Sequence, residues 1–161
     1  MEEKILEMLN ENNDIQIQEK GIELAKEIKD ISLFMLPSMT SAIWKNCAKV
    51  IESKSDEELK PYILDLLVWI QDINRSGAFR IYFRLKDMDV NILYPDYIKV
   101  VEKCILENDD IWLDWLSGLI EKESLKDKLP IHLYRILKEH NTIFWQGNSE
   151  LYRKFMEEND L

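Results

Sequence analysis

The sequence predicts an all-α protein built from stacked helical hairpins, and three observations lead to this fold class. Glycine and proline occur only four times each among 161 residues, too few for the many turns of a β-sandwich. Apolar residues recur at helical spacing, and no segment shows the alternation of a half-buried strand. The stretch 61–85 has the pattern of two amphipathic helices joined by a short polar turn, a unit that must stack on neighbours to bury its apolar surface.

The N-terminal part of the chain predicts three helices separated by turns. Asp14 can cap the second of them, and Pro37 interrupts the apolar run that precedes the third. The expected ranges are 2–10, 14–30 and 41–52, the last of them started by Ser38, Thr40 or Ser41.

The strongest helix start in the sequence lies at Ser55. Glu58 completes a capping box with this serine, and the acidic residues between them favour the positive end of the helix dipole. The helix is predicted to continue to about Asp72 and to be apolar around most of its circumference, as in a central helix with neighbours on both sides. Its polar line consists of Glu58, Asp65 and Asp72, with about 10 Å from one residue to the next.

The C-terminal half continues the pattern of helices and short turns. Its expected elements are a helix over 77–88, a helix with Pro95 in its first turn, a helix over 108–123, a linker over 124–128, a helix opened by Pro130, a loop over 141–148 and a last helix capped by Ser149. The sequence thus predicts eight or nine short helices in a single domain over residues 1–161. The hairpins 41–72, 55–88 and 95–123 have lengths of about 32 residues, which favours a HEAT-like α-α superhelix (solenoid) over a non-repeating bundle.

One segment also resembles a known family. Residues 66–85, LLVWIQDINRSGAFRIYFRL, are similar to an uncharacterised bacterial family of domains of unknown function whose pattern reads about LLEWLQDxNWPGA. The matching positions are Leu66, Leu67, Trp69, Gln71, Asp72, Asn74, Gly77 and Ala78, whereas Arg75 and Ser76 replace the Trp-Pro of the family. The resemblance covers about residues 44–85 and implies a small intracellular protein with a HEAT-like fold. Similar helical families often act as immunity or adaptor proteins.

The charge of the chain favours a protein partner over nucleic acid. The formal net charge is −10, with 31 acidic against 21 basic residues. Nucleic-acid and anionic-membrane partners need clustered Lys and Arg, so neither is expected, whereas a basic protein is compatible with this charge. The N-terminal residues lack the pattern of a signal peptide, and no apolar run reaches the roughly 18 residues of a membrane span. A cytoplasmic location is therefore expected.

No motif in the sequence points to catalysis or to a bound cofactor. Cys47 and Cys104 lie within helical patterns and are interpreted as buried, reduced thiols. His132 and His140 are eight residues apart, which is not a metal-binding spacing on a helix. Neither a phosphate-binding glycine loop nor a nucleophile with an adjacent base is evident. We therefore expect no metal, no cofactor and no enzymatic activity.

The expected function is binding of a protein partner that carries basic groups. The predicted partner-binding residues are five carboxylates and one aromatic anchor, namely Glu58, Asp65, Asp72, Asp110, Asp114 and Trp145. Trp145 is the tryptophan expected to be exposed, because it falls in a loop, whereas the other four lie on apolar helical stripes. A solvated surface without a partner is the alternative interpretation of the carboxylates, and packing of the loop is the alternative for Trp145. Asp72 can also stabilise the turn, by accepting from the Gly77 or Ala78 amide or by pairing with Arg80.

A different function class remains open at this point. A HEAT-like enzyme acting on nucleic acid, resembling the helical-repeat DNA glycosylases, needs a basic concave groove that contains an acid and aromatics. Such a groove would be lined by Arg75, Arg80 and Arg84 beside Asp72 and Trp69. The partner's identity and the oligomeric state are left open by the sequence.

Overall fold

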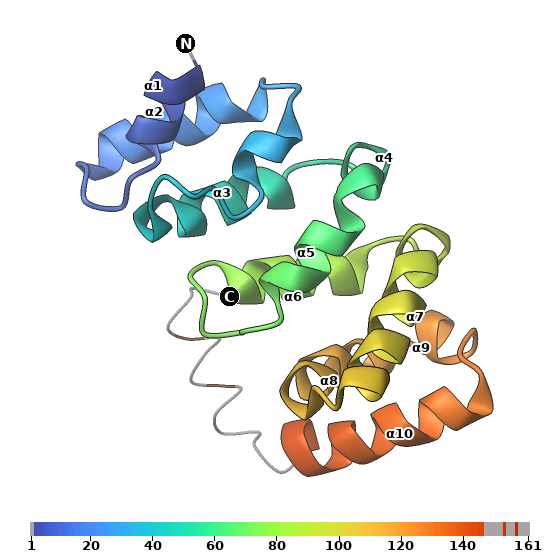
Figure 1. The fold of residues 1–161 in the computed structure, drawn as a ribbon. Coiled ribbons are helices and arrows are strands. Elements are labelled where there is room, and N and C mark those ends of the chain that lie inside the picture. The colour runs from blue at the N-terminus through green and yellow to red at the C-terminus, as the bar shows by residue number, and fades with distance from the viewer. Residues whose placement is uncertain (1, 147–152, 154–156, 158–161) are drawn as a thin grey trace.

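The computed structural model describes residues 2–146, 153 and 157, and the described part is helical throughout, without a strand (Figure 1). Its all-α class confirms the prediction. The α-helices are α1 (Glu2–Met8), α2 (Ile15–Lys26), α3 (Trp44–Glu52), α4 (Asp56–Leu59), α5 (Ile63–Trp69), α6 (Ala78–Asp87), α7 (Val90–Glu107), α8 (Asp110–Ser117), α9 (Glu123–Lys126) and α10 (Ile131–Asn141). Short 3₁₀ helices are η1 (Ile31–Phe34), η2 (Ser41–Ile43), η3 (Lys60–Tyr62) and η4 (Gly118–Glu121), and η5 (Thr142–Gln146) is a π-helical turn.

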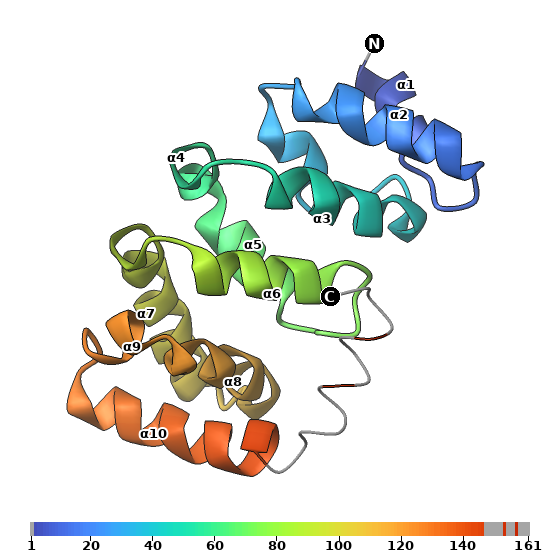
Figure 2. The ribbon, with the colours of Figure 1, turned by 180° about the vertical axis from the view of Figure 1, so that it is seen from behind.

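The helices stack in chain order from α1 and α2 at one end to α10 at the other (Figures 1 and 2). In one layer α2 packs on α3, α3 on α6, α6 on η4 and α8 on α10. In the second layer α5 packs on α7 and α7 on α9. A continuous buried cluster runs from Ile5 in α1 to Trp145 in η5, so each helix buries apolar surface against the next level.

The predicted continuous helix over 55–72 is wrong, because the chain divides there into α4, η3 and α5. The capping box itself is confirmed: Ser55 accepts from the Glu58 amide, and the Glu58 carboxylate accepts from the Ser55 amide. Pro61 has no amide hydrogen for the helical ladder, and the backbone tightens into a 3₁₀ turn around it. Leu64 and Val68 are exposed, so α5 is not buried on all sides.

Other boundaries also differ from the prediction. α2 ends at Lys26 because Asp30 caps η1, accepting from the Ser32 amide. α7 begins at Val90 because the Asp89 carboxylate accepts from the Asn91 amide, so Pro95 lies inside the helix instead of at its start. The predicted linker 124–128 contains most of α9, and α8 already ends at Ser117. The expected last helix, starting at Ser149, lies outside the described residues.

The two cysteines are buried and free, as predicted. Burial raises the pKa of the Cys47 thiol to about 12, so this group is neutral and inert in the folded protein. None of the helices in the described part of the chain is both long and apolar enough to cross a membrane.

Candidate functional site

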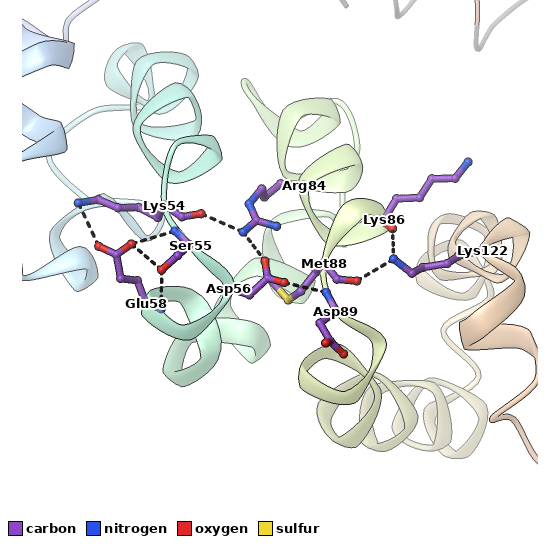
Figure 3. A network of polar contacts seen from close by, with 9 residues as sticks. All are labelled: Lys54, Ser55, Asp56, Glu58, Arg84, Lys86, Met88, Asp89 and Lys122. Carbon is purple, nitrogen blue, oxygen red and sulfur yellow. Dashed lines mark hydrogen bonds and ion pairs between the residues drawn. The ribbon is translucent and has the colours of Figure 1, made fainter.

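Lysine side chains bridge successive levels of the stack along one of its edges (Figure 3). The Lys54 ammonium donates to the carbonyl oxygens of Lys26 at 2.6 Å and Ile28 at 3.1 Å, just where α2 ends. These carbonyls lie at the negative end of the α2 dipole and lack helical partners. Lys54 is only 7% exposed, so its charge serves the fold and not a partner.

The same contact recurs two levels further along the stack. The Lys122 ammonium donates to the carbonyl oxygens of Lys86 at 2.9 Å and Met88 at 2.7 Å, where α6 ends (Figure 3). Between the two lysines, Arg84 donates to the carbonyl oxygen of Lys54. We name this side of the stack the braced edge, and it comprises the turns 27–30, 53–56, 87–89 and 121–122.

Asp56 is the carboxylate at the centre of the braced edge (Figure 3). One of its oxygens accepts from the Arg84 guanidinium and the other from the Asp89 amide at 2.8 Å. Burial alone would raise the pKa of Asp56, but these hydrogen bonds and the charge of Arg84 outweigh it and lower the pKa below its usual value.

Glu58, one of the predicted partner-binding residues, also lies on the braced edge. Its carboxylate accepts from the Ser55 amide at 2.8 Å and from the Ser55 hydroxyl at 2.7 Å, and Lys54 lies 3.7 Å away. The hydrogen bonds from Ser55 lower the pKa of Glu58. Glu58 therefore caps α4 and is separated from the other predicted acidic residues.

The opposite edge of the stack, on the left in Figure 1, contains the turn between α1 and α2, the turn between α5 and α6 and the C-terminal end of α10. Trp112 donates its indole N–H to the carbonyl oxygen of Leu67 at 3.2 Å, which joins the start of α8 to α5. Gln71 donates to Asp109 at 3.3 Å, beside the same contact. We name this side the acidic edge, and its carboxylates are Glu11, Asp72, Asp109, Asp110, Asp114 and Glu139.

Asp72 lies in the turn between α5 and α6, but its predicted bonds are wrong. Its carboxylate accepts from the backbone amide of Asn74 at 3.0 Å and from the Asn74 side chain at 3.2 Å. Arg80 pairs with Glu52 at 2.9 Å instead of with Asp72. Asp72 is exposed at the acidic edge, where a second molecule can reach it.

Asp110 and Asp114 meet a histidine in a cleft between α8 and α10. The cleft has a volume of about 240 Å³ and is lined by Asp110, Asp114, Glu139, His140 and Ile143. His140 Nδ1 lies 2.7 Å from the Asp114 carboxylate, and His140 Nε2 lies 4.0 Å from the Asp110 carboxylate. The side chain of Asp110 is 78% exposed, so the mouth of the cleft is acidic.

The composition of this cleft suits binding of a cation better than covalent chemistry. A His–Asp pair supports catalysis when it activates a nucleophile, but the described residues that line the cleft include no hydroxyl or thiol side chain. Its carboxylates accept hydrogen bonds from an ammonium or guanidinium group, and Ile143 supplies an apolar wall for the aliphatic stem of that side chain. Within the described residues, no three of the His, Cys, Asp and Glu side chains are placed to hold a metal ion.

The prediction that Trp145 is exposed is wrong, and the alternative, packing of this segment against the fold, is confirmed. Trp145 is 7% exposed; its ring stacks on Tyr82 with centroids 5.2 Å apart and its N–H donates to the carbonyl oxygen of Asp114 at 2.7 Å. The chain after α10 continues as η5 instead of leaving as a loop, and this turn directs the indole inward. Trp145 is therefore part of the core next to the cleft between α8 and α10, where it hydrogen-bonds the backbone of Asp114.

Asp65 stands apart from the other predicted site residues. It is exposed on α5, and in the part of the chain that the structure describes it has no hydrogen bond or ion pair. The break at η3 removes the common helix face that would have aligned it with Glu58.

The residues named for a nucleic-acid groove have contacts within the fold. All three guanidinium groups have intramolecular partners: Arg75 donates to the carbonyl oxygen of Val68, Arg80 pairs with Glu52 and Arg84 pairs with Asp56. Trp69 is fully buried and donates to the carbonyl oxygen of Ser76.

Comparison with known proteins places this architecture in a family. Residues 45–148 match the model of a domain of unknown function, DUF5071. The chain belongs to this family. No curated protein and no solved structure matches it. The DUF5071 region contains both bridging lysines and the whole α8–α10 cleft, and it extends well beyond the residues 44–85 that carried the resemblance in the sequence. Helices α1 and α2 precede it.

Sequence reasoning identified Asp110 and Asp114 but missed His140 and Glu139. These two residues lie at the end of α10, and only the packing of α10 on α8 brings them to the aspartates. The spacing of the two histidines gives no sign of this contact, because no local pattern connects His140 with a carboxylate 26 residues earlier in the chain. Asp109 was recognisable as a cap of α8, although its contact with Gln71 was not.

Proposed function

We propose that this DUF5071 protein is a non-enzymatic helical-repeat protein that binds a basic protein partner through its acidic edge. Its stacked hairpins constitute a HEAT-like α-α solenoid, and the turns along one side of that solenoid carry the binding carboxylates. The most specific form of the proposal is a cytoplasmic immunity-type or adaptor protein.

The observation that carries the proposal is the unequal use of charge at the two edges. On the braced edge, Lys54, Arg84 and Lys122 are bonded to backbone carbonyls and, for Arg84, to a carboxylate. On the acidic edge, Asp72 and Asp110 are exposed. Among the described residues no Lys or Arg forms an ion pair with either carboxylate, and His140 lies 4.0 Å from Asp110. The unbalanced negative charge therefore faces outward at one side, where it accelerates encounter with a basic surface.

The α8–α10 cleft gives this edge a specific feature as well as a charge. A Lys or Arg side chain that enters it meets the Asp110, Asp114 and Glu139 carboxylates at its head and Ile143 along its stem. Charge-assisted hydrogen bonds of this kind are stronger than neutral ones, and partial burial reduces their screening by salt.

The test compares two triple variants in pull-downs from the native lysate at low and high salt. The edge variant carries Asp72→Asn, Asp110→Asn and Glu139→Gln, which remove three charges and preserve the shapes of the side chains. The control variant carries Glu19→Gln, Glu102→Gln and Asp127→Asn, three exposed acids outside the acidic edge. Both variants have the same net charge.

We expect the edge variant to lose capture of its partner by at least about tenfold at low salt, because exposed interfacial charges each contribute up to about 1 kcal/mol. The control variant is expected to retain capture, and high salt should release the partner from the wild type. A partner captured equally by both variants, or held equally at both salt concentrations, would contradict the proposal.

A further inference from the structure

A groove at the N-terminal end of the stack is lined by apolar and basic side chains. The pair α1 and α2 encloses a groove with a volume of about 380 Å³, lined by Lys4, Ile5, Met8, Lys20 and Leu24. The two helices pack closely at Gly21, where a Cβ atom would lie 2.7 Å from the Met8 Cβ. The groove is thus a fixed feature of a tightly packed helix pair.

The groove continues as an apolar strip on the outer face of α2. Ile17 and Leu24 are each 42% exposed, and they share one helix face with Lys20 at positions i, i+3 and i+7. α1 packs on α2 and covers part of its surface. Beside α1, α2 still presents these two half-exposed aliphatic side chains, where a further helix could pack.

The charged groups at this groove are both basic and both unpaired. Lys4 and Lys20 have no ion-pair partner among the described residues, and no acidic residue belongs to the lining. The chain elsewhere ties many of its basic groups into intramolecular contacts, as on the braced edge. An apolar groove with two available ammonium groups is complementary to an apolar helix face bordered by carboxylates.

We propose that the α1–α2 groove binds an amphipathic helix of a partner protein whose apolar face is flanked by Asp or Glu. Aliphatic residues at i, i+3 and i+7 of that helix fill the groove against Ile5, Met8 and Leu24, the usual arrangement of a helix bound between two others. Its carboxylates pair with Lys4 and Lys20 at the borders. The site differs from the acidic edge in the charge that it prefers, and the helices that form it precede the DUF5071 region.

The test uses fluorescent synthetic peptides of roughly 16 residues and the full chain. One peptide has leucines at i, i+3, i+4 and i+7 with glutamates beside them, and a second has lysines in place of the glutamates. Fluorescence anisotropy then gives the Kd of each peptide for the wild type, for Leu24→Gln, for the double variant Lys4→Glu and Lys20→Glu, and for a control double variant, Arg135→Glu and Lys138→Glu. The control has the same change in charge on exposed residues of α10. Far-UV circular dichroism establishes that each variant is folded.

We expect saturable binding of the glutamate peptide, weakened at least about tenfold by Leu24→Gln and by the reversal of Lys4 and Lys20, and changed less than about twofold in the control. The lysine peptide is expected to bind at least about tenfold more weakly than the glutamate peptide. Absence of saturable binding, equal affinity for both peptides, or no effect of the groove variants would overturn the proposal. Sedimentation analysis adds one further outcome: a dimer of the wild type that Leu24→Gln abolishes would assign the groove to a second copy of the chain instead.

Discussion

Lys54 and Lys122 make the same contact at two levels of the stack. Each ammonium group donates to two carbonyl oxygens at the C-terminal end of an earlier helix of the same layer, α2 for Lys54 and α6 for Lys122. A lysine in this position both caps a helix and connects two levels. The braced edge therefore contains the same kind of contact at two levels.

Replacing either lysine by methionine should destabilise the protein. Lys54→Met and Lys122→Met each leave two carbonyl groups at a helix end without their donor, and a lost hydrogen bond to a charged group costs about 1.5–3 kcal/mol. We expect a loss of that size in the free energy of unfolding for each variant, measured by urea denaturation. Because the two sites have no partner in common, their effects should add to within about 0.5 kcal/mol.

Lys60→Met serves as the control for both variants. Its ammonium is exposed and lies 3.9 Å from Glu57, a geometry that contributes at most a few tenths of a kcal/mol. If Lys60→Met were as destabilising as Lys54→Met, loss of any lysine would be sufficient and the bridging role would be refuted.

Asp56→Asn should make the stability of the protein less dependent on pH. The lowered pKa of Asp56 in the folded state means that its contribution is fully present above the ordinary Asp pKa of about 3.9 and is lost as pH falls through the folded value. We expect the variant to be less stable than the wild type by about 1–3 kcal/mol at pH 7, with the difference decreasing below about pH 4. Denaturation at a series of pH values measures it.

The partner of Asp56 provides the check on this result. In an Arg84→Leu background the carboxylate keeps only the Asp89 amide, so Asp56→Asn should cost less there than in the wild type. A difference between wild type and Asp56→Asn that stays constant from pH 7 to pH 3 would show that Asp56 is not the titrating group.

The extent to which the sequence determines these features depends on the range of the interactions. Caps and turns involve neighbouring residues, so the Ser55–Glu58 box and the turn before α6 were predictable. The burial of the two cysteines was predictable from their place in the helical pattern of apolar residues. Contacts between levels involve residues far apart in the chain, such as those of His140 with Asp114 and of Trp112 with Leu67. Their formation depends on how far each helix rotates and shifts on its neighbour, which the spacing of apolar residues does not specify.

Trp145 illustrates why the prediction of an exposed site failed. A segment that follows a helix and contains Gly147 and Asn148 has the composition of a loop, and an aromatic residue within a loop is often exposed. The stack, however, leaves space beside Gly118, whose lack of a side chain admits the Trp145 ring next to Tyr82. That space depends on two other levels of the structure, so no local pattern could reveal it.

Gly77 should tolerate no side chain. It has φ of 80°, a left-handed conformation, and a Cβ atom there would lie 2.6 Å from the Cβ of Ala48 on α3. The conformation alone costs about 1–2 kcal/mol for alanine, and the contact with α3 adds to it. We therefore expect Gly77→Ala to reduce the free energy of unfolding by at least about 2 kcal/mol, measured by urea denaturation.

The contribution of the contact is separated by a second change on α3. Ala48→Gly removes the Cβ that Gly77→Ala would meet, at a cost of about 1 kcal/mol for glycine in a helix. The double variant should then be more stable than the sum of the two single effects predicts. Strict additivity would indicate that only the backbone conformation of residue 77, and no clash with α3, causes the loss.

The two cysteines offer a measurement of whether the stack unfolds as one unit. Burial raises the pKa of Cys47 and of Cys104 to about 12, with nearby carboxylates contributing at Cys104, so neither thiol forms the reactive thiolate at pH 8 until its surroundings open. Cys47 lies in α3 and Cys104 in α7, on different levels of the stack. In the single-cysteine variants Cys104→Ala and Cys47→Ala, we expect both thiols to become reactive toward a disulfide reagent at the same urea concentration, because one continuous core joins the levels. If Cys104 reacts at a lower urea concentration than Cys47, the C-terminal levels open on their own, as repeat arrays with weak coupling between neighbours do.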